Sequence, residues 1–94
     1  MPSKLIRTKQ DLLGAAQHEN GTARYRLQRA SAEYRAATVA WEAAGCPDEG
    51  DLAYAYARAA HWHEHCQQSA RRVAEALVRA KIAVHAAGSL VRRG

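Results

Sequence analysis

One short run of the chain brings together side chains that can bind a metal ion or form a reactive thiol, His61-Trp62-His63-Glu64-His65-Cys66. Within it, His61, Glu64 and His65 match the His-x-x-Glu-His string of the inverted zinc peptidases. On a helix, histidines four residues apart lie on one face, so both rings could reach one zinc ion while Glu64 serves as a base. Such enzymes also require a third ligand and a substrate cleft, and neither is evident in 94 residues. The string therefore indicates a candidate metal site more than a peptidase.

A metal site built on His61, Glu64 and His65 would bind zinc or another transition metal and would need further ligands. Glu33, His63 or a second copy of the chain could complete the shell. The alternative is a solvated, partly ion-paired face, because the helical phase of the apolar residues turns His61 and His65 outward. The sequence leaves both hypotheses open.

His63 and Cys66, three residues apart, belong to the packed side of the same helix, where Tyr34 is predicted to face them. A buried cluster of this kind could bind metal or hold a reactive thiol. More often the histidine is satisfied by one hydrogen bond, here to the Tyr34 hydroxyl, and the cysteine fills apolar space. The chain has no glycine-rich phosphate loop, no nucleophile elbow and no candidate catalytic group beside Cys66 other than His63. We therefore predict that the protein is not an enzyme.

These residues must be positioned by a long helix, since the forty residues from Leu52 to Val91 contain no proline and a single glycine. Apolar and small residues recur there at alternating spacings of four and three, the pattern of a helix packed lengthwise on another helix. We call these positions the seam. The seam positions of this segment are Leu52, Tyr56, Ala59, His63, Cys66, Ala70, Val73, Leu77, Ala80, Val84, Ala87 and Val91.

A second stripe with the same alternation runs through the first half of the chain, at Leu13, Ala16, Asn20, Ala23, Leu27, Ala30, Tyr34, Ala37, Trp41 and Ala44. It predicts a first helix over about 8–45, after a basic arm, with Thr8 as N-cap and Asp11 in the capping-box position. Asn20-Gly21 is a turn signal inside this stripe, and an interior glycine costs about 1 kcal/mol relative to alanine. Because the phase passes through Asn20 without a shift, we favour one continuous or kinked helix over two helices separated there.

The segment Gly45–Asp51 is the clear break between the two stripes. Gly45 suits the left-handed position after a helix end, and Asp48 suits the N-cap of the next helix, predicted over about 49–92. A connection this short folds two helices back on each other, so the predicted fold is all-α, a long antiparallel two-helix hairpin forming one domain over 1–94. The register that follows pairs Trp41 with Tyr56, Tyr34 with His63, Ala30 with Cys66, Asn20 with Leu77, and Leu13 with Val84.

The second helix carries more apolar surface than one neighbouring helix can cover. One flank of its seam holds Ala55, Trp62, Ser69, Ala76, Ala83 and Leu90, and the other holds Ala53, Ala60, Gln67, Ala74, Lys81 and Gly88. We therefore predict a small protein–protein interaction module that pairs into a homodimeric four-helix bundle or docks on a helical partner. The expected interface residues are Trp62, Tyr56, Ala55, Ala76, Ala83 and Leu90.

The net charge of +5, most of it from arginine, admits nucleic acid, an anionic membrane or an acidic protein as a partner. The arginines are spread along both helices without any known nucleic-acid-binding motif, so a basic nucleic-acid-binding accessory protein is an alternative function. The sequence shows no secretory signal, and no segment approaches the ~20 apolar residues of a membrane span. We expect a cytoplasmic protein with two reduced thiols, because about 24 Å of helix between Gly50 and Cys66 excludes a disulfide to Cys46.

With a hairpin and a tryptophan just before its turn, the chain resembles the Trp-x-Gly family of small type VII secretion substrates. The similarity covers roughly Thr22 to Ala87, two alanine-rich helices with Tyr56 and Trp62 on the second. The motif stands here as Trp41-Glu42-Ala43-Ala44-Gly45, and the second helix is not followed by the family's Tyr-x-x-x-Asp/Glu signal. The resemblance implies hairpins that pair into four-helix bundles and export that does not use a signal peptide. The alanine and arginine usage is similar to that of proteins from GC-rich bacteria.

Overall fold

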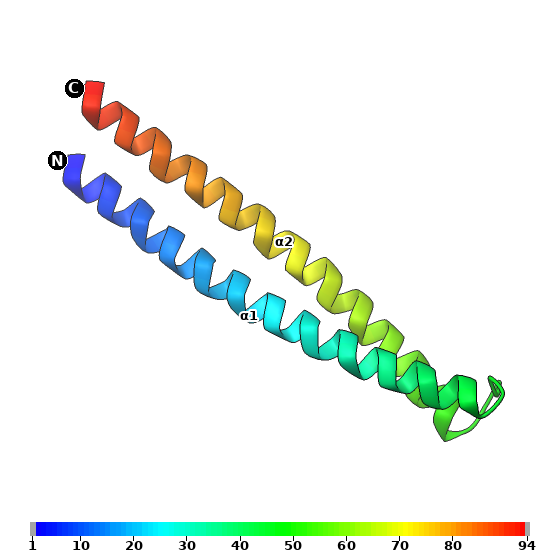
Figure 1. The fold of residues 1–94 in the computed structure, drawn as a ribbon. Helices are drawn as coiled ribbons and strands as arrows, with labels where there is room; N and C mark the ends of the chain where they lie inside the picture. Colours follow the sequence, from blue (N-terminus) through cyan, green and yellow to red (C-terminus); the bar gives the residue numbers. More distant parts are fainter. Residues whose placement is uncertain (1, 94) are drawn as a thin grey trace. The chain divides into compact units, whose positions relative to one another are not determined.

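The computed structural model describes residues 2–93 of the chain, with side chains described for residues 7–89. It consists of two helices, α1 (Pro2–Ala43) and α2 (Asp51–Arg93), joined by residues 44–50 (Figure 1). No strand occurs within residues 2–93. The helices run in opposite directions on the two sides of the turn, so the predicted all-α helical hairpin is confirmed.

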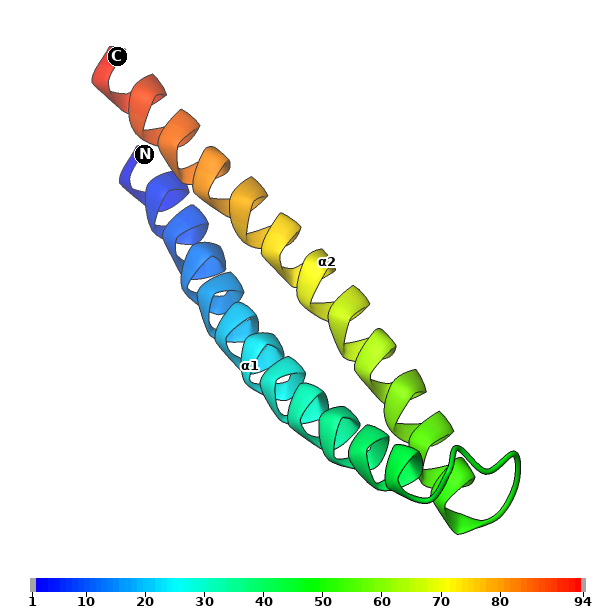
Figure 2. The ribbon, with the colours of Figure 1, turned by 45° about the vertical axis from the view of Figure 1, so that its right-hand side comes forward.

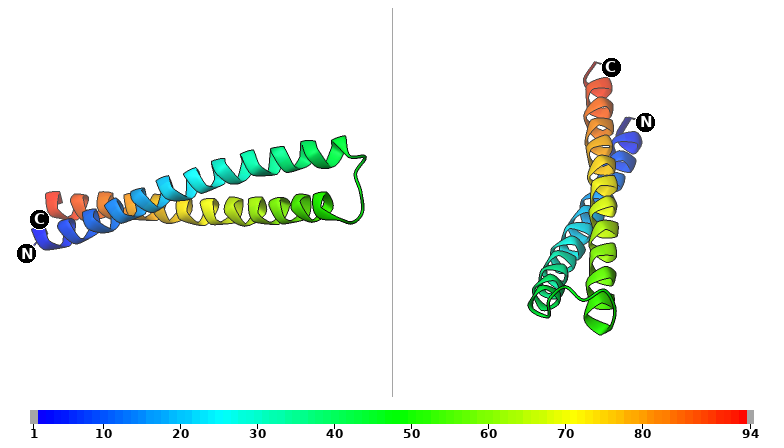
Figure 3. Two further views of the ribbon diagram at one scale, coloured as in Figure 1. Left: turned by 90° about the horizontal axis from the view of Figure 1, so that it is seen from below. Right: turned by 90° about the vertical axis from the view of Figure 1, so that its right-hand side faces the viewer.

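Packing divides the chain into two units, which we describe separately. The turn unit is Ala23–Ala70, and it contains the turn and the histidine run. The terminal unit combines Met1–Thr22 with Arg71–Gly94. In the turn unit, the cyan-to-green part of α1 lies beside the green-to-yellow part of α2 (Figure 3), and no third element of the described chain covers either flank of this pair.

The seam predicted from the spacing is the packed side of the helices in each unit. Nearly all seam residues with described side chains are buried or half-buried, while Ala44 and Leu52 are exposed beside the turn. Val91 lies outside the described side chains. The separation of two packed helices is set by the side chains between them, and small ones permit a close approach. The most deeply covered side chains are indeed small: Ala23, Ala30, Cys66 and Ala87.

The first helix begins at Pro2, so the prediction of a basic arm ending at an N-cap on Thr8 is wrong. Proline is well suited to the first turn of a helix, because its ring presets φ and its missing N–H would have no acceptor within the helix. The helix then continues through Asn20-Gly21 without a break and ends at Ala43. Of the two alternatives for this point, the structure adopts the continuous helix.

Replacing Gly21 by alanine is expected to stabilise the protein by about 0.5–1 kcal/mol, since alanine restricts the unfolded chain and favours helix. A methyl group built at Gly21 meets no atom within 4 Å, so nothing in the fold opposes the change. Urea unfolding followed by circular dichroism measures the effect. Gly45→Ala is the matched control. It is expected to destabilise the protein, because the φ of 85° at Gly45 is strained for alanine. Equal effects of the two substitutions would contradict the prediction.

Two backbone hydrogen bonds close the end of α1. The N–H of Gly45 donates to the carbonyl of Glu42, and the N–H of Cys46 donates to the carbonyl of Trp41, both at 3.0 Å. This is the Schellman arrangement, in which the helix ends on a residue in the left-handed region. Gly45 adopts that conformation with a φ of 85°, as predicted, and Cys46 follows with a φ of 56°.

The second helix begins later than predicted, and Asp48 is not its N-cap. The N–H of Tyr54 donates to the carbonyl of Gly50 at 3.0 Å, which makes Gly50 the cap and Asp51 the first helical residue. The φ of Gly50 is 100°, a value that glycine adopts without strain. The chain therefore needs the whole segment 44–50 to reverse direction (Figure 2), and Asp48 lies within that loop.

Candidate functional site

The packed side of the turn unit contains a continuous stack of aromatic rings. The ring centroids are 4.3 Å apart for Trp41 and Tyr56, 5.8 Å for Tyr56 and Tyr34, and 5.2 Å for Tyr34 and His63. The first and last of these pairs are those that the register predicted, so the predicted register is confirmed in this unit. Each such contact contributes about 0.5–1.5 kcal/mol beyond the area it buries. The stack therefore fixes how α2 lies along α1 near the turn.

The turn itself is attached to this stack through Trp41. The indole Nε1–H donates a hydrogen bond of 2.9 Å to the carbonyl of Pro47, while the ring lies nearly parallel to Tyr56, at 12°. One side chain thereby holds both the loop and the start of α2. The sequence placed Trp41 at the end of the first helix, but its bond to Pro47 depends on the path of the loop.

His63 is hydrogen-bonded to Ser31, and the prediction of a bond to the Tyr34 hydroxyl is wrong. Its Nε2 lies 3.0 Å from the Ser31 Oγ. The Tyr34 ring stacks on the imidazole at 18°, and its hydroxyl lies 3.4 Å from the hydroxyl of Tyr56. Serine one turn earlier on α1 meets the ring nitrogen instead. His63 is thus a satisfied histidine of the packed side.

The hydrogen bond between the two tyrosines raises the pKa of the Tyr56 hydroxyl above its ordinary value of 10, with smaller contributions from the Tyr34 charge and from burial. A raised pKa in the folded state means that the fold favours the neutral phenol. The associated stability is present below the ordinary pKa and is lost as the pH rises through the folded-state value.

We expect Tyr34→Phe to lower the pKa of Tyr56 toward the ordinary value of 10, because it removes the largest cause of the shift. Tyrosine-selective NMR across the alkaline range measures the titration of the Tyr56 ring. Tyr25→Phe is the control, because Tyr25 is exposed and its removal should leave the Tyr56 titration unchanged. An unaltered Tyr56 titration in Tyr34→Phe would show that the hydroxyl contact is not the cause.

The candidate metal ligands His61, Glu64 and His65 are all exposed. The imidazole of His65 stacks on the indole of Trp62, with centroids 5.2 Å apart. Among the side chains that the structure describes, no three histidine, cysteine, aspartate or glutamate side chains gather closely enough to hold a metal ion. The run therefore contains residues with different surroundings, His63 and Cys66 on the packed side and the other histidines outside.

Both cysteines are free, as the sequence predicted. Cys66 is buried at the seam, and Cys46 is exposed in the loop. The structure places Cys66 on the side of α2 that faces α1, one turn beyond His63, where it fills space between the helices.

A groove lies beside the seam, on the flank that the sequence assigned to Trp62. Its volume is about 600 Å³, and it is open to solvent. We call it the Trp62 groove. It is lined by Glu33, Tyr54, Ala55, Arg58, Ala59, His61 and Trp62.

The apolar wall of the Trp62 groove is formed by side chains that lack cover from the chain itself. Tyr54 is 69% exposed and Trp62 is 47% exposed. Sequence reasoning identified Trp62 and Ala55 but missed Tyr54 and Arg58. Tyr54, Arg58 and His61 follow one another at spacings of four and three, so a search for a second stripe on α2 could have found them.

The other predicted interface residues have different positions. Tyr56 is half-buried in the aromatic stack, so its contacts lie within the chain. In the terminal unit, Ala76 is exposed and Ala83 is half-buried. Leu90 belongs to α2, but its side chain lies outside the described residues.

The arginines of the described side chains are exposed, and the one ion pair formed between them and acidic residues joins Arg79 to Glu75 at 3.7 Å. An exposed pair of this kind contributes at most about 1 kcal/mol. Within residues 2–93, no stretch of either helix combines the length and the apolar character that a membrane span requires.

No family model, curated protein or solved structure matches the chain. What the protein does is therefore inferred from the residues of the turn unit and from the surface that the chain leaves uncovered.

Proposed function

We propose that the protein is a non-enzymatic assembly module, a helical hairpin that docks through α2 on a second copy of itself or on another helical protein. The docking surface is the flank of α2 that carries Ala55 and Trp62, both exposed in the turn unit. The fold would then provide a rigid helical surface, and the side chains on that surface would bind another protein.

The observation that carries this proposal is the accessible surface of the chain. It amounts to 7316 Å², although the mass is only 10.3 kDa. A compact monomer of that mass exposes about 5,400 Å², so the hairpin leaves about 1,900 Å² more in contact with solvent. A dimer in which each copy covered that surplus would bury about 3,800 Å² in total, within the range of obligate interfaces.

The nature of the exposed side chains supports the same conclusion. Large hydrophobic residues of α2 lie in solvent at positions away from the seam, namely Tyr54, Trp62, Val78 and Ile82. Buried apolar side chains are few and small, so the core of one hairpin contributes little hydrophobic stabilisation. A partner helix would supply the missing apolar contact.

Sedimentation equilibrium of the native protein over a range of concentrations tests the proposal. The expected result is a mass of about twice the 10.3 kDa chain, or a defined complex with a helical protein that copurifies. A single-chain mass at all concentrations, with no copurifying protein, would contradict it.

Two alternatives are tested on the same preparation. Metal analysis after native purification addresses binding by His61 and His65, which are exposed on one face of α2. A titration with DNA or RNA at increasing salt addresses a basic accessory protein, suggested by exposed arginines that lack acidic partners among the described side chains. Bound metal in stoichiometric amount, or nucleic-acid binding that weakens steeply with salt, would favour the respective alternative.

Because the chain resembles the Trp-x-Gly hairpins, we also propose that it is exported through a type VII secretion pathway. In its support, Trp41 lies at the turn and holds the loop through Pro47. Comparing the location of the tagged chain in bacteria with and without a type VII apparatus would distinguish export from residence in the cytoplasm.

A further inference from the structure

The Trp62 groove carries an inference that rests on the proposed function and specifies it. We propose that the groove seats the same groove of a second copy of the chain, across a two-fold axis that passes between Glu33 and Arg58. In this arrangement Glu33 of each copy pairs with the partner's Arg58, and the apolar walls around Trp62 cover each other.

The first support comes from the charges at the groove. Glu33 belongs to α1 and Arg58 to α2, so the two opposite charges come from different helices. Among the described side chains, neither forms an ion pair with another residue of the chain. Two unpaired and opposite charges at one apolar groove are available to a partner that places a positive charge opposite Glu33 and a negative charge opposite Arg58.

A second copy presents that reverse arrangement by symmetry. In a two-fold interface, residue i of one copy contacts residue j of the other, and j contacts i. When the axis passes between Glu33 and Arg58, each carboxylate faces a guanidinium of the other copy, so the interface contains two Glu33–Arg58 pairs.

Other occupants fit the same surface less well. A polyanion such as nucleic acid would meet the Glu33 carboxylate at the groove. An apolar helix without charges would remove Glu33 and Arg58 from water without pairing them, which costs more than the contact returns. The net charge of +5 disfavours association of two copies in general, but the carboxylate of Glu33 and the guanidinium of Arg58 give the groove lining no net charge.

The uncovered area also fits a second copy. The hairpin exposes about 1,900 Å² more than a compact monomer of its mass, and the groove with exposed Tyr54 and Trp62 is the place where apolar surface and opposite charges coincide.

Charge reversal tests the pairing. We expect Glu33→Arg and Arg58→Glu each to raise the dimer Kd at least about tenfold in sedimentation equilibrium, because each puts two pairs of like charges at the interface. The double reversal restores opposite charges and is expected to return the Kd to within about threefold of the wild-type value. Added salt should weaken both effects.

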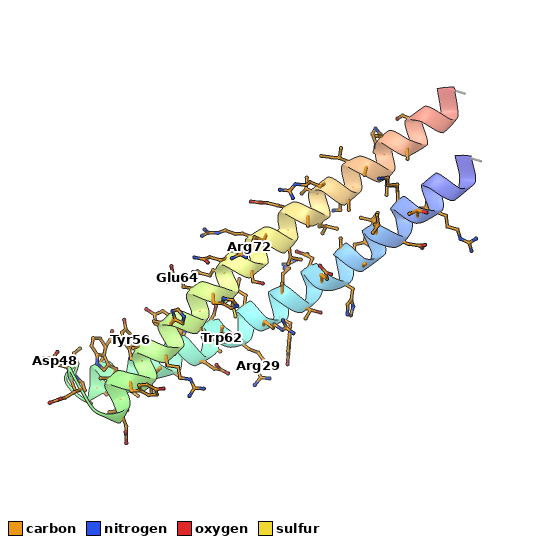
Figure 4. The ribbon with its side chains drawn as sticks, turned by 180° about the vertical axis from the view of Figure 1, so that it is seen from behind. Arg29, Asp48, Tyr56, Trp62, Glu64 and Arg72 are labelled. Atoms are coloured by element: carbon orange, nitrogen blue, oxygen red, sulfur yellow. The ribbon has the colours of Figure 1, made fainter. Side chains whose placement is uncertain are left out.

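Glu64→Arg and Arg35→Glu are the matched controls, since they make the same changes in net charge at exposed positions that do not line the groove. In Figure 4, Glu64 and Trp62 leave α2 on opposite sides. A wild-type dimer whose Kd responds equally to groove and control reversals would overturn the inference while the proposed function stands. Single reversals without rescue by the double reversal would also overturn it. A wild-type protein without a dimer would instead contradict homodimerisation itself.

Discussion

Trp41→Ala is expected to lower the free energy of unfolding by about 2–3 kcal/mol. The substitution removes three contributions at once: the stack on Tyr56, the hydrogen bond from Nε1 to the Pro47 carbonyl, and apolar cover at the end of the seam. The stack contributes about 1 kcal/mol and the hydrogen bond a similar amount. In a small domain of marginal stability this is a large share of the total.

Urea unfolding followed by far-ultraviolet circular dichroism measures the loss. Trp41→Phe keeps a ring for the stack but has no N–H, so we expect an intermediate effect of about 1 kcal/mol. Leu52→Ala is the control, because Leu52 is a large apolar residue beside the turn that is already exposed. If Trp41→Ala destabilised the protein no more than Leu52→Ala, the attachment of the loop through Trp41 would be unimportant.

Trp62→Arg is expected to separate the proposed dimer into single chains without altering the helices. Trp62 is 47% exposed, and its one described ring contact is with His65 on the same helix, so the hairpin does not depend on it. At an interface, however, a central tryptophan typically contributes at least about 2 kcal/mol, equivalent to a rise of about thirtyfold in Kd. An arginine in its place also adds charge to a basic protein.

The mass of the assembly and the circular dichroism spectrum together check this result. Val39→Arg is the matched control, since Val39 is also an exposed apolar residue but belongs to α1 and does not line the Trp62 groove. We expect dissociation for Trp62→Arg and an unchanged mass for Val39→Arg. Loss of helix in Trp62→Arg would mean that the side chain serves the hairpin, and an unchanged mass would exclude it from the interface.

The two tryptophans have different roles, although the amino-acid composition does not distinguish them. Trp41 lies on the seam of α1 and is half-buried against the chain's own turn. Trp62 lies one position before a seam residue of α2, so the helical period turns its ring away from the packed side. A shift of one position along a helix thus distinguishes a residue that stabilises the fold from one available to a partner.

The sequence by itself determined the two helices, the turn and the pairing of Trp41 with Tyr56 and of Tyr34 with His63. The reason is that alternating spacings of three and four define one face of a helix, and a short turn then leaves little freedom in how two such faces align. The left-handed conformation of Gly45 was predictable for the same kind of local reason.

Only the tertiary structure decided which atoms meet. His63 bonds to Ser31, α2 is capped by Gly50, and the Trp62 groove combines Glu33 of α1 with Arg58 of α2. The periodicity of a sequence indicates the direction in which a side chain leaves its helix but not its rotamer. It also describes each helix separately and does not give the distance between atoms of two helices. A hydrogen bond, a loop path and a groove each depend on the distance between two segments, which is set when the helices pack.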